Sequence, residues 1–111
     1  MSKALREVRQ DGQATIAVPT GEVDLHHSPG LYQELVEVCK ARPARLVIDL
    51  REVTYMDSSG VSTLVEVFRT VNRYGGKLVL LAPTARVRGM FEIARLDKFF
   101  VICDTQEEAM G

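Results

Sequence analysis

The 111-residue sequence carries almost no net charge and lacks any long hydrophobic run. Its 14 basic and 15 acidic residues give a formal net charge of −1, so no overall charge attracts it to nucleic acid or to an acidic membrane surface. No segment reaches the roughly 20 apolar residues that a transmembrane helix needs. Residues 1–7 also lack the apolar core of a signal peptide. We therefore expect a cytoplasmic protein without nucleic-acid or membrane partners.

Cysteines and nucleotide-binding motifs are equally scarce. The two cysteines, Cys39 and Cys103, lie far apart, form no Cys-x-x-Cys pair and have apolar neighbours, so we interpret them as core residues rather than metal or redox sites. The motif Gly-x-x-x-x-Gly-Lys-Ser/Thr does not occur, which excludes a P-loop nucleotide site. Internal repeats and low-complexity tracts are absent as well. The chain is therefore expected to be one domain over residues 1–111, with neither a metal nor a cofactor.

Segments with strand and helix patterns alternate along the chain. Residues 3–9 and 13–19 are typical of two strands joined by a tight turn at Asp11-Gly12, which makes them antiparallel. Residues 20–27 are expected to form a loop, and Ser28 to cap the helix that follows. Helices are predicted over residues 28–40, 58–74, 83–94 and 104–110, and further strands over residues 45–50, 77–82 and 99–103. This order predicts an α/β fold with a mixed, mostly parallel β-sheet, an N-terminal β-hairpin and helices packed on the sheet.

The most informative segment is Asp57-Ser58-Ser59-Gly60, which comes shortly after the apolar run at residues 45–50. It opens an amphipathic helix, where backbone N–H groups lack partners and the helix dipole is positive. Such a helix start can hold a phosphate, either bound or covalently attached to a serine. Helix capping alone would require only one of these residues, and a single cap stabilises a helix by about 1 kcal/mol. Three residues able to cap and a glycine exceed that requirement, so a capping role and a functional role both stay open.

Two other kinds of site compete with this interpretation. A serine nucleophile at Ser58 or Ser59 would need a base, and the only histidines are His26 and His27, in the loop after the second strand. The hydrolase motif Gly-x-Ser-x-Gly is absent, and so short a chain leaves little room for a substrate pocket. A phospho-aspartate receiver domain would use Asp49, but no acidic pair follows the first strand. We therefore expect a protein that is not an enzyme and has no small-molecule substrate.

Over nearly its whole length the chain resembles the STAS domain, and within that family the free-standing bacterial anti-sigma factor antagonists. The resemblance rests on residues 21–24, 46–50, 53–60, 75–78, 87–96 and 99–109. Asp-Ser-Ser-Gly after a strand, in this order of elements, is its most specific part, and it implies the STAS fold. Val61-Ser62 departs from it, because many relatives have Leu-Gly there, and this leaves the exact partner open.

The resemblance implies a regulatory binding protein controlled by phosphorylation. In that family the serine after the aspartate, here Ser58 with Ser59 as the alternative, is phosphorylated by an anti-sigma factor that is a serine kinase. The unphosphorylated antagonist binds this partner and releases a sigma factor, phosphorylation ends the binding, and a PP2C-type phosphatase restores it. The implied contact surface comprises Glu22, Asp24, His26, His27, Asp57, Ser58, Ser59, Gly60 and Ser62. The alternative is a STAS module of a stress-signalling complex or of a lipid-transport system.

Overall fold

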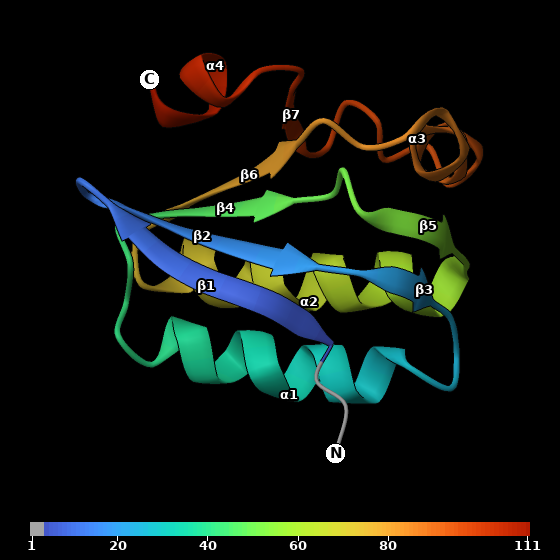
Figure 1. Ribbon diagram of the computed structural model, residues 1–111, viewed down its shortest axis with the longest axis horizontal. Helices are drawn as coiled ribbons and strands as arrows, with labels where there is room; N and C mark the ends of the chain where they lie inside the picture. The colour runs from blue at the N-terminus through green and yellow to red at the C-terminus, as the bar shows by residue number, and fades with distance from the viewer. Residues whose placement is uncertain (1–3) are drawn as a thin grey trace.

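A central sheet of five strands organises the chain, and the computed structural model describes it for residues 4–111 (Figure 1). Its strands stand in the order β1 (Leu5–Asp11), β2 (Ala14–Pro19), β4 (Arg45–Asp49), β6 (Lys77–Leu81) and β7 (Val101–Cys103). β1 and β2 form the antiparallel hairpin, and every other neighbouring pair is parallel. The predicted mixed, mostly parallel sheet with an N-terminal hairpin is confirmed.

A second sheet of two strands was not predicted. β3 (Gly21–Val23) pairs in parallel with β5 (Val53–Met56), whereas the sequence indicated a loop over residues 20–27 and no strand over residues 53–56. Gly21 adopts a positive φ of 76°, which glycine tolerates without steric cost, and there the chain turns from β2 into β3. Both strands are too short for a period-two pattern to stand out, and each depends on a partner distant in the sequence.

Different helices cover the two faces of the central sheet (Figure 1). α1 (Ser28–Cys39) and α2 (Ser58–Arg73) pack side by side on one face, and the short α4 (Gln106–Met110) packs on the other. α3 (Ala85–Ile93) packs against β5. Because the central strands have helices on both sides, Leu46, Val47 and Ile48 of β4 are all buried, which accounts for its continuous apolar run.

The ends of the elements differ in detail from the expectations. α1 begins at Ser28, but the capping position is His27, whose side chain makes no capping hydrogen bond, so the predicted cap by Ser28 is wrong. β7 begins at Val101 rather than at residue 99, so it is shorter than predicted. Phe100 lies outside the strand but is buried in the core, and its ring lies 5.5 Å from that of Phe91. Within residues 4–111, no helix combines the length and the hydrophobicity of a membrane-spanning segment.

The two cysteines are both free thiols. Cys39 is buried in the core on the α1 side, as predicted. Cys103 is only half-buried, on β7, where it packs at the border of the smaller core under α4. Burial raises the pKa of the Cys39 thiol, which makes it a poor nucleophile.

Candidate functional site

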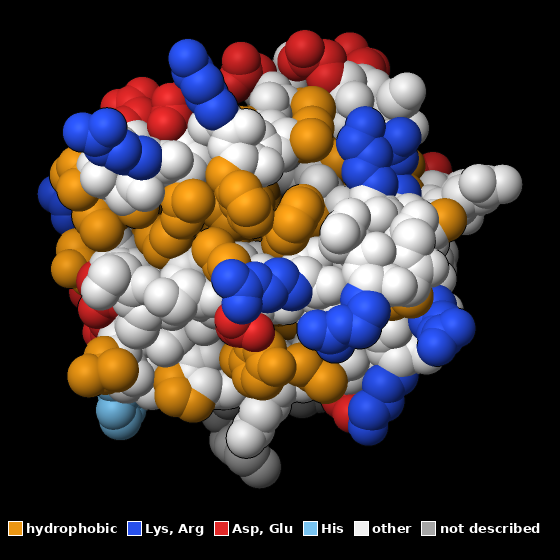
Figure 2. All heavy atoms as spheres, turned by 180° about the vertical axis from the view of Figure 1, so that it is seen from behind, with side chains coloured by type: hydrophobic (Ala, Val, Ile, Leu, Met, Phe, Trp, Pro, Cys, Tyr) orange, Lys and Arg blue, Asp and Glu red, His pale blue; other side chains and the backbone are white. Residues whose placement is uncertain are grey.

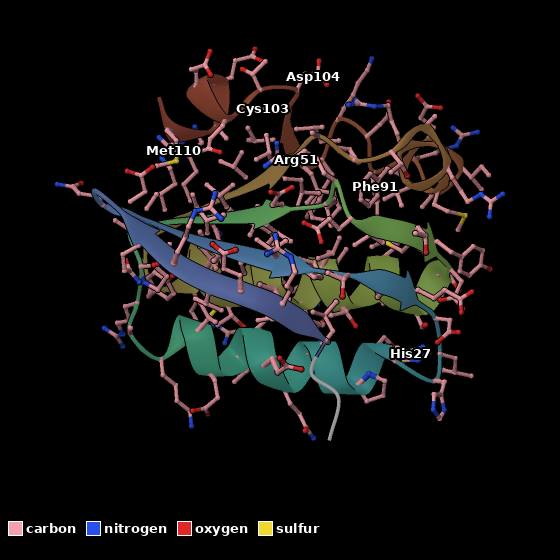
Figure 3. The ribbon with its side chains drawn as sticks, viewed as in Figure 1. His27, Arg51, Phe91, Cys103, Asp104 and Met110 are labelled. Atoms are coloured by element: carbon pink, nitrogen blue, oxygen red, sulfur yellow. The ribbon has the colours of Figure 1, made fainter. Side chains whose placement is uncertain are left out.

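The start of α2 and the loop after β3 lie together at one end of the small sheet. β3 and β5 run in parallel, so residues 24–27 and Asp57 leave the sheet at the same edge. The backbone N–H of Asp57 donates to the carbonyl oxygen of Val23 at 3.3 Å, which fixes this edge. His27, at the end of the loop, lies at this end of the molecule (Figure 3). The unpredicted strand pair therefore brings the serine turn and the histidine loop together.

Asp57 holds the start of α2 and the neighbouring loop with one carboxylate. Its Oδ1 accepts hydrogen bonds from the backbone N–H groups of Ser59 and Gly60, at 2.9 and 3.3 Å, as an N-cap residue does. The same oxygen accepts the hydroxyl of Ser59 at 2.5 Å, and Oδ2 accepts the backbone N–H of Leu25 at 3.2 Å. The Ser59 hydroxyl, followed by these backbone donors, holds the pKa of Asp57 below its ordinary value. Asp57 is therefore a fixed negative charge at neutral pH.

Asp24 closes the loop on itself in a similar way. Its Oδ1 accepts from the backbone N–H groups of His26 and His27, at 3.1 and 3.0 Å, and lies 2.7 Å from Nδ1 of His27. The hydrogen bond with the His27 ring is the main reason that the pKa of Asp24 lies below its ordinary value. The backbone carbonyl of Asp24 also accepts from His27 and Ser28, so α1 starts directly from this turn. The loop is thus held by carboxylates at both of its sides.

The two serines of the turn occupy different environments. Ser58 is the first residue of α2; its side chain is exposed, and within residues 4–111 its hydroxyl has no hydrogen-bond partner. Ser59 is half-buried, and its hydroxyl donates to Asp57. A reagent or enzyme that approaches from solvent therefore finds the hydroxyl of Ser58 free and that of Ser59 engaged.

Gly60 is buried, and it is needed for packing at the back of the turn. A Cβ atom at this position would lie 2.6 Å from Cγ of Met56 and 2.7 Å from the carbonyl oxygen of Val23. Any other residue would push α2 away from β3. The sequence alone assigned Gly60 to a contact surface, whereas its own atoms face the inside of the fold.

The remaining residues that the family resemblance assigned to the contact surface lie around the serine turn, but not all of them contact it. Asp24, His26 and Asp57 line one shallow depression together with Leu25 and Tyr55. Glu22 is exposed on β3 and lies with both histidines in a separate pocket of about 570 Å³, between β3 and the start of α1. Ser62 is exposed on α2, one turn beyond Ser58.

The competing catalytic arrangements do not form. The ring of His27 is hydrogen-bonded to Asp24, and in residues 4–111 no hydrogen bond joins either histidine to Ser58 or Ser59. Asp49, which a receiver domain would phosphorylate, is buried, and its carboxylate is bound by the guanidinium of Arg51 at 2.7 Å. The described part of the chain also contains no cluster of three or more His, Cys, Asp or Glu residues that could hold a metal ion.

Ser58 also stands at one end of an apolar groove that the sequence did not predict. The groove has a volume of about 520 Å³ and runs between α2 and α3, with walls formed by Val61, Val65, Met90, Ile93 and Leu96. Glu66 and Arg69, an ion pair at 3.3 Å, also line it. Seen from behind, hydrophobic side chains gather in a band across this side of the molecule (Figure 2). The sequence did contain a signal, since the apolar residues of α3 cover more of its circumference than one core face requires.

The chain is similar to known proteins in both sequence and fold. The family model described as "STAS domain" matches residues 6–109. The anti-sigma-B factor antagonist of Bacillus subtilis (strain 168) is 35% identical over 92 residues, which cover 83% of this chain and 81% of that protein. The crystal structure of an anti-sigma factor antagonist from Mycobacterium paratuberculosis superposes with a TM-score of 0.85 at 26% identity, over 94% of this chain and 88% of that one.

Two structures of SpoIIAA, a cell fate determinant of Bacillus, are also similar. Its unphosphorylated form matches with a TM-score of 0.75 at 23% identity, over 96% of this chain and 93% of that one. Its phosphorylated form matches with a TM-score of 0.70 at 21% identity, over 96% of each chain. At this level of identity the two structures establish the common fold.

Proposed function

The chain belongs to the STAS domain family, and on that premise we propose that it acts as an anti-sigma factor antagonist. Its relatives at 33–35% identity carry that name, and the chain covers four fifths of their length. In this proposal the unphosphorylated protein binds an anti-sigma factor that is also a serine kinase, and a sigma factor is released. Phosphorylation of Ser58 ends the binding, and a PP2C-type phosphatase restores it. The protein has a regulatory role and performs no catalysis itself.

The observation that carries the proposal is the difference between the two serines. The Ser58 hydroxyl is exposed and unengaged in the described chain, whereas Ser59 uses its hydroxyl to hold Asp57. Ser58 is therefore the better acceptor of a phosphoryl group. SpoIIAA, which shares the fold, is known in both phosphorylated and unphosphorylated forms, and this precedent supports a phosphorylation switch here.

The fold should tolerate a phosphate on Ser58. The group adds a charge of about −1.5 to −2, and at the first turn of α2 it meets a favourable field of about 0.3–2 kcal/mol. The four hydrogen bonds to the Asp57 carboxylate come from Leu25, Ser59 and Gly60, so none of them uses the side chain that is modified.

The penalty therefore falls on the complex. Ser58 lines the apolar groove and directly follows Asp57, which binds the loop at residues 24–27. We therefore expect a partner that covers both surfaces to cover Ser58 as well. Removing a phosphate from water in such an interface costs several kcal/mol. The repulsion between the phosphate and ionised Asp57, which water screens in the free protein, also becomes stronger when a partner removes that water. A loss of about 4 kcal/mol weakens binding roughly a thousandfold.

The proposal is tested with Ser58→Ala as bait in extracts of the source organism, followed by measurement of affinity for the purified protein that is captured. We expect an anti-sigma factor with an ATP-binding kinase fold, which binds Ser58→Ala constitutively and binds Ser58→Asp at least about a hundredfold more weakly. Ser59→Ala is the matched control, and after incubation with the kinase and ATP it should still gain one phosphate by mass spectrometry.

Capture of a transporter ATPase or of a large STAS scaffold would instead support the alternative, a STAS module of a lipid-transport system or of a stress-signalling complex. A Ser58→Asp variant that binds as well as the parent would refute the switch.

A further inference from the structure

Leu25 is an exposed apolar side chain on a loop that is otherwise polar. It is 75% exposed, and in the described chain only Ile93 is a more exposed large hydrophobic residue, at 78%. A single exposed leucine needs no explanation by itself. The loop that carries it, however, is held unusually firmly and lies beside the proposed acceptor serine.

The backbone of this loop is fixed on both sides of Leu25. The N–H of Leu25 itself donates to Oδ2 of Asp57, and the next two N–H groups, of His26 and His27, donate to Oδ1 of Asp24. A side chain presented on a backbone already ordered in the free protein loses less conformational freedom on binding than one on a mobile loop. Leu25 is thus presented to solvent in a fixed place.

The two carboxylates beside Leu25 each accept several hydrogen bonds inside the protein. The carboxylate of Asp57 accepts four hydrogen bonds, and one oxygen of Asp24 accepts three. Tyr55, also partly exposed, lines the same depression as Leu25. The loop thus presents apolar surface inside a polar border, which is the usual arrangement in a protein interface.

We propose that Leu25 is the apolar anchor with which the loop enters a hydrophobic pocket of the anti-sigma factor. This inference rests on the proposed function and extends it to a second residue of the same surface. The hydrogen bond from Leu25 to Asp57 places the anchor beside the residue that precedes Ser58. Because Asp57 directly precedes Ser58, a partner surface that binds Leu25 would lie close to the phosphoacceptor.

The test uses the purified anti-sigma factor captured with Ser58→Ala and compares Leu25→Ala, Leu25→Met and Val8→Ala. Val8 is a matched control, because it is 46% exposed but lies on β1. Loss of a central apolar contact should weaken binding at least tenfold in Leu25→Ala, whereas Leu25→Met and Val8→Ala should stay within threefold of the parent. In the kinase reaction, Leu25→Ala should raise KM for the antagonist at least tenfold and leave kcat unchanged, as loss of uniform binding does. All three variants should keep the melting temperature of the parent to within a few degrees.

The two possible failures are distinguishable. If the parent binds and is phosphorylated on Ser58, but Leu25→Ala behaves like the parent within twofold, the anchor is wrong and the proposed function stands. If Ser58→Ala captures no anti-sigma factor, or the unphosphorylated parent does not bind the one captured, the proposed function fails and the anchor fails with it.

Discussion

Alanine in place of Gly60 tests whether the close approach of α2 to β3 holds the site together. The added Cβ would lie 2.6 Å from Cγ of Met56, 2.7 Å from the carbonyl oxygen of Val23 and 2.9 Å from its Cγ1. The methionine side chain can move aside, but the carbonyl belongs to the backbone of β3. The helix and the strand must therefore separate by several tenths of an ångström, and overpacking of this kind costs about 1–3 kcal/mol.

Gly30→Ala is a matched control for this substitution. Gly30 and Gly60 are each the third residue of their helices, α1 and α2, and a Cβ at Gly30 would meet nothing within 4 Å. The helix preference for alanine over glycine, at most about 1 kcal/mol, acts in both variants and cancels in their difference. That difference isolates the steric cost. For a domain of this size about 1 kcal/mol corresponds to about 4 °C, so Gly60→Ala should melt about 4–12 °C below Gly30→Ala.

Thermal unfolding followed by circular dichroism measures this gap, and amide hydrogen exchange reports its structural consequence. Because α2 carries Asp57, separation from β3 should also weaken the hydrogen bond from Leu25 to Asp57 and speed exchange of the Leu25 amide. Gly30→Ala should leave that exchange rate unchanged. If the two variants melted within 2 °C of each other, steric closeness would not be the reason for glycine at residue 60.

Two further predictions concern the Asp57 carboxylate. Its lowered pKa means that the ionised form stabilises the fold at pH values above the ordinary 3.8 and that this stabilisation is lost as the pH falls through the lowered value. Asp57→Asn should therefore flatten the decrease in urea-unfolding free energy below about pH 4, and parallel acid limbs for variant and parent would contradict this reasoning. Ser59→Asp should melt at least about 4 °C below Ser58→Asp, because it replaces a donor to Asp57 with a second carboxylate. Equal melting temperatures for these two variants would mean that the serines are equivalent.

The parts of the fold that the sequence predicted are those with strong local patterns. The sequence identified β4 by its continuous apolar run, because a strand that is buried on both faces carries apolar residues at successive positions. It identified α2 by apolar residues at helical spacing, because only one face of that helix is buried. β3 and β5 have three and four residues and leave no such trace, since each is stabilised mainly by the other. The sequence could therefore suggest only that the loop and Ser58 follow strand ends on one edge of a sheet, and not the strand pair that joins them.

The candidate site was predictable to the same extent. The sequence located Asp57-Ser58-Ser59-Gly60 at a helix start and gave a reason for a phosphate there, but the preference for Ser58 over Ser59 rested on the family resemblance alone. The structure distinguishes the environments of the two serines. Asp57 occupies the N-cap position, and its carboxylate therefore binds the second and third residues of the helix and leaves Ser58, the first, unbound. The sequence could not show that Leu25 is exposed or that an apolar groove lies between α2 and α3. The identity of an apolar residue does not by itself indicate whether the folded chain buries it.

In the proposed switch, the position of Asp57 would account for modification of Ser58 acting on binding while modification of Ser59 would act on the fold. The Asp57 carboxylate joins α2 to the loop that presents Leu25, and the Ser59 hydroxyl is one of its donors. A phosphate on Ser59 would remove that donor and place a dianion against the carboxylate, so its cost would appear in the free protein. A phosphate on Ser58 leaves all four hydrogen bonds in place and projects into solvent at the positive end of α2. Its cost appears only when a partner removes that solvent, and a reversible switch between binding and release requires this separation.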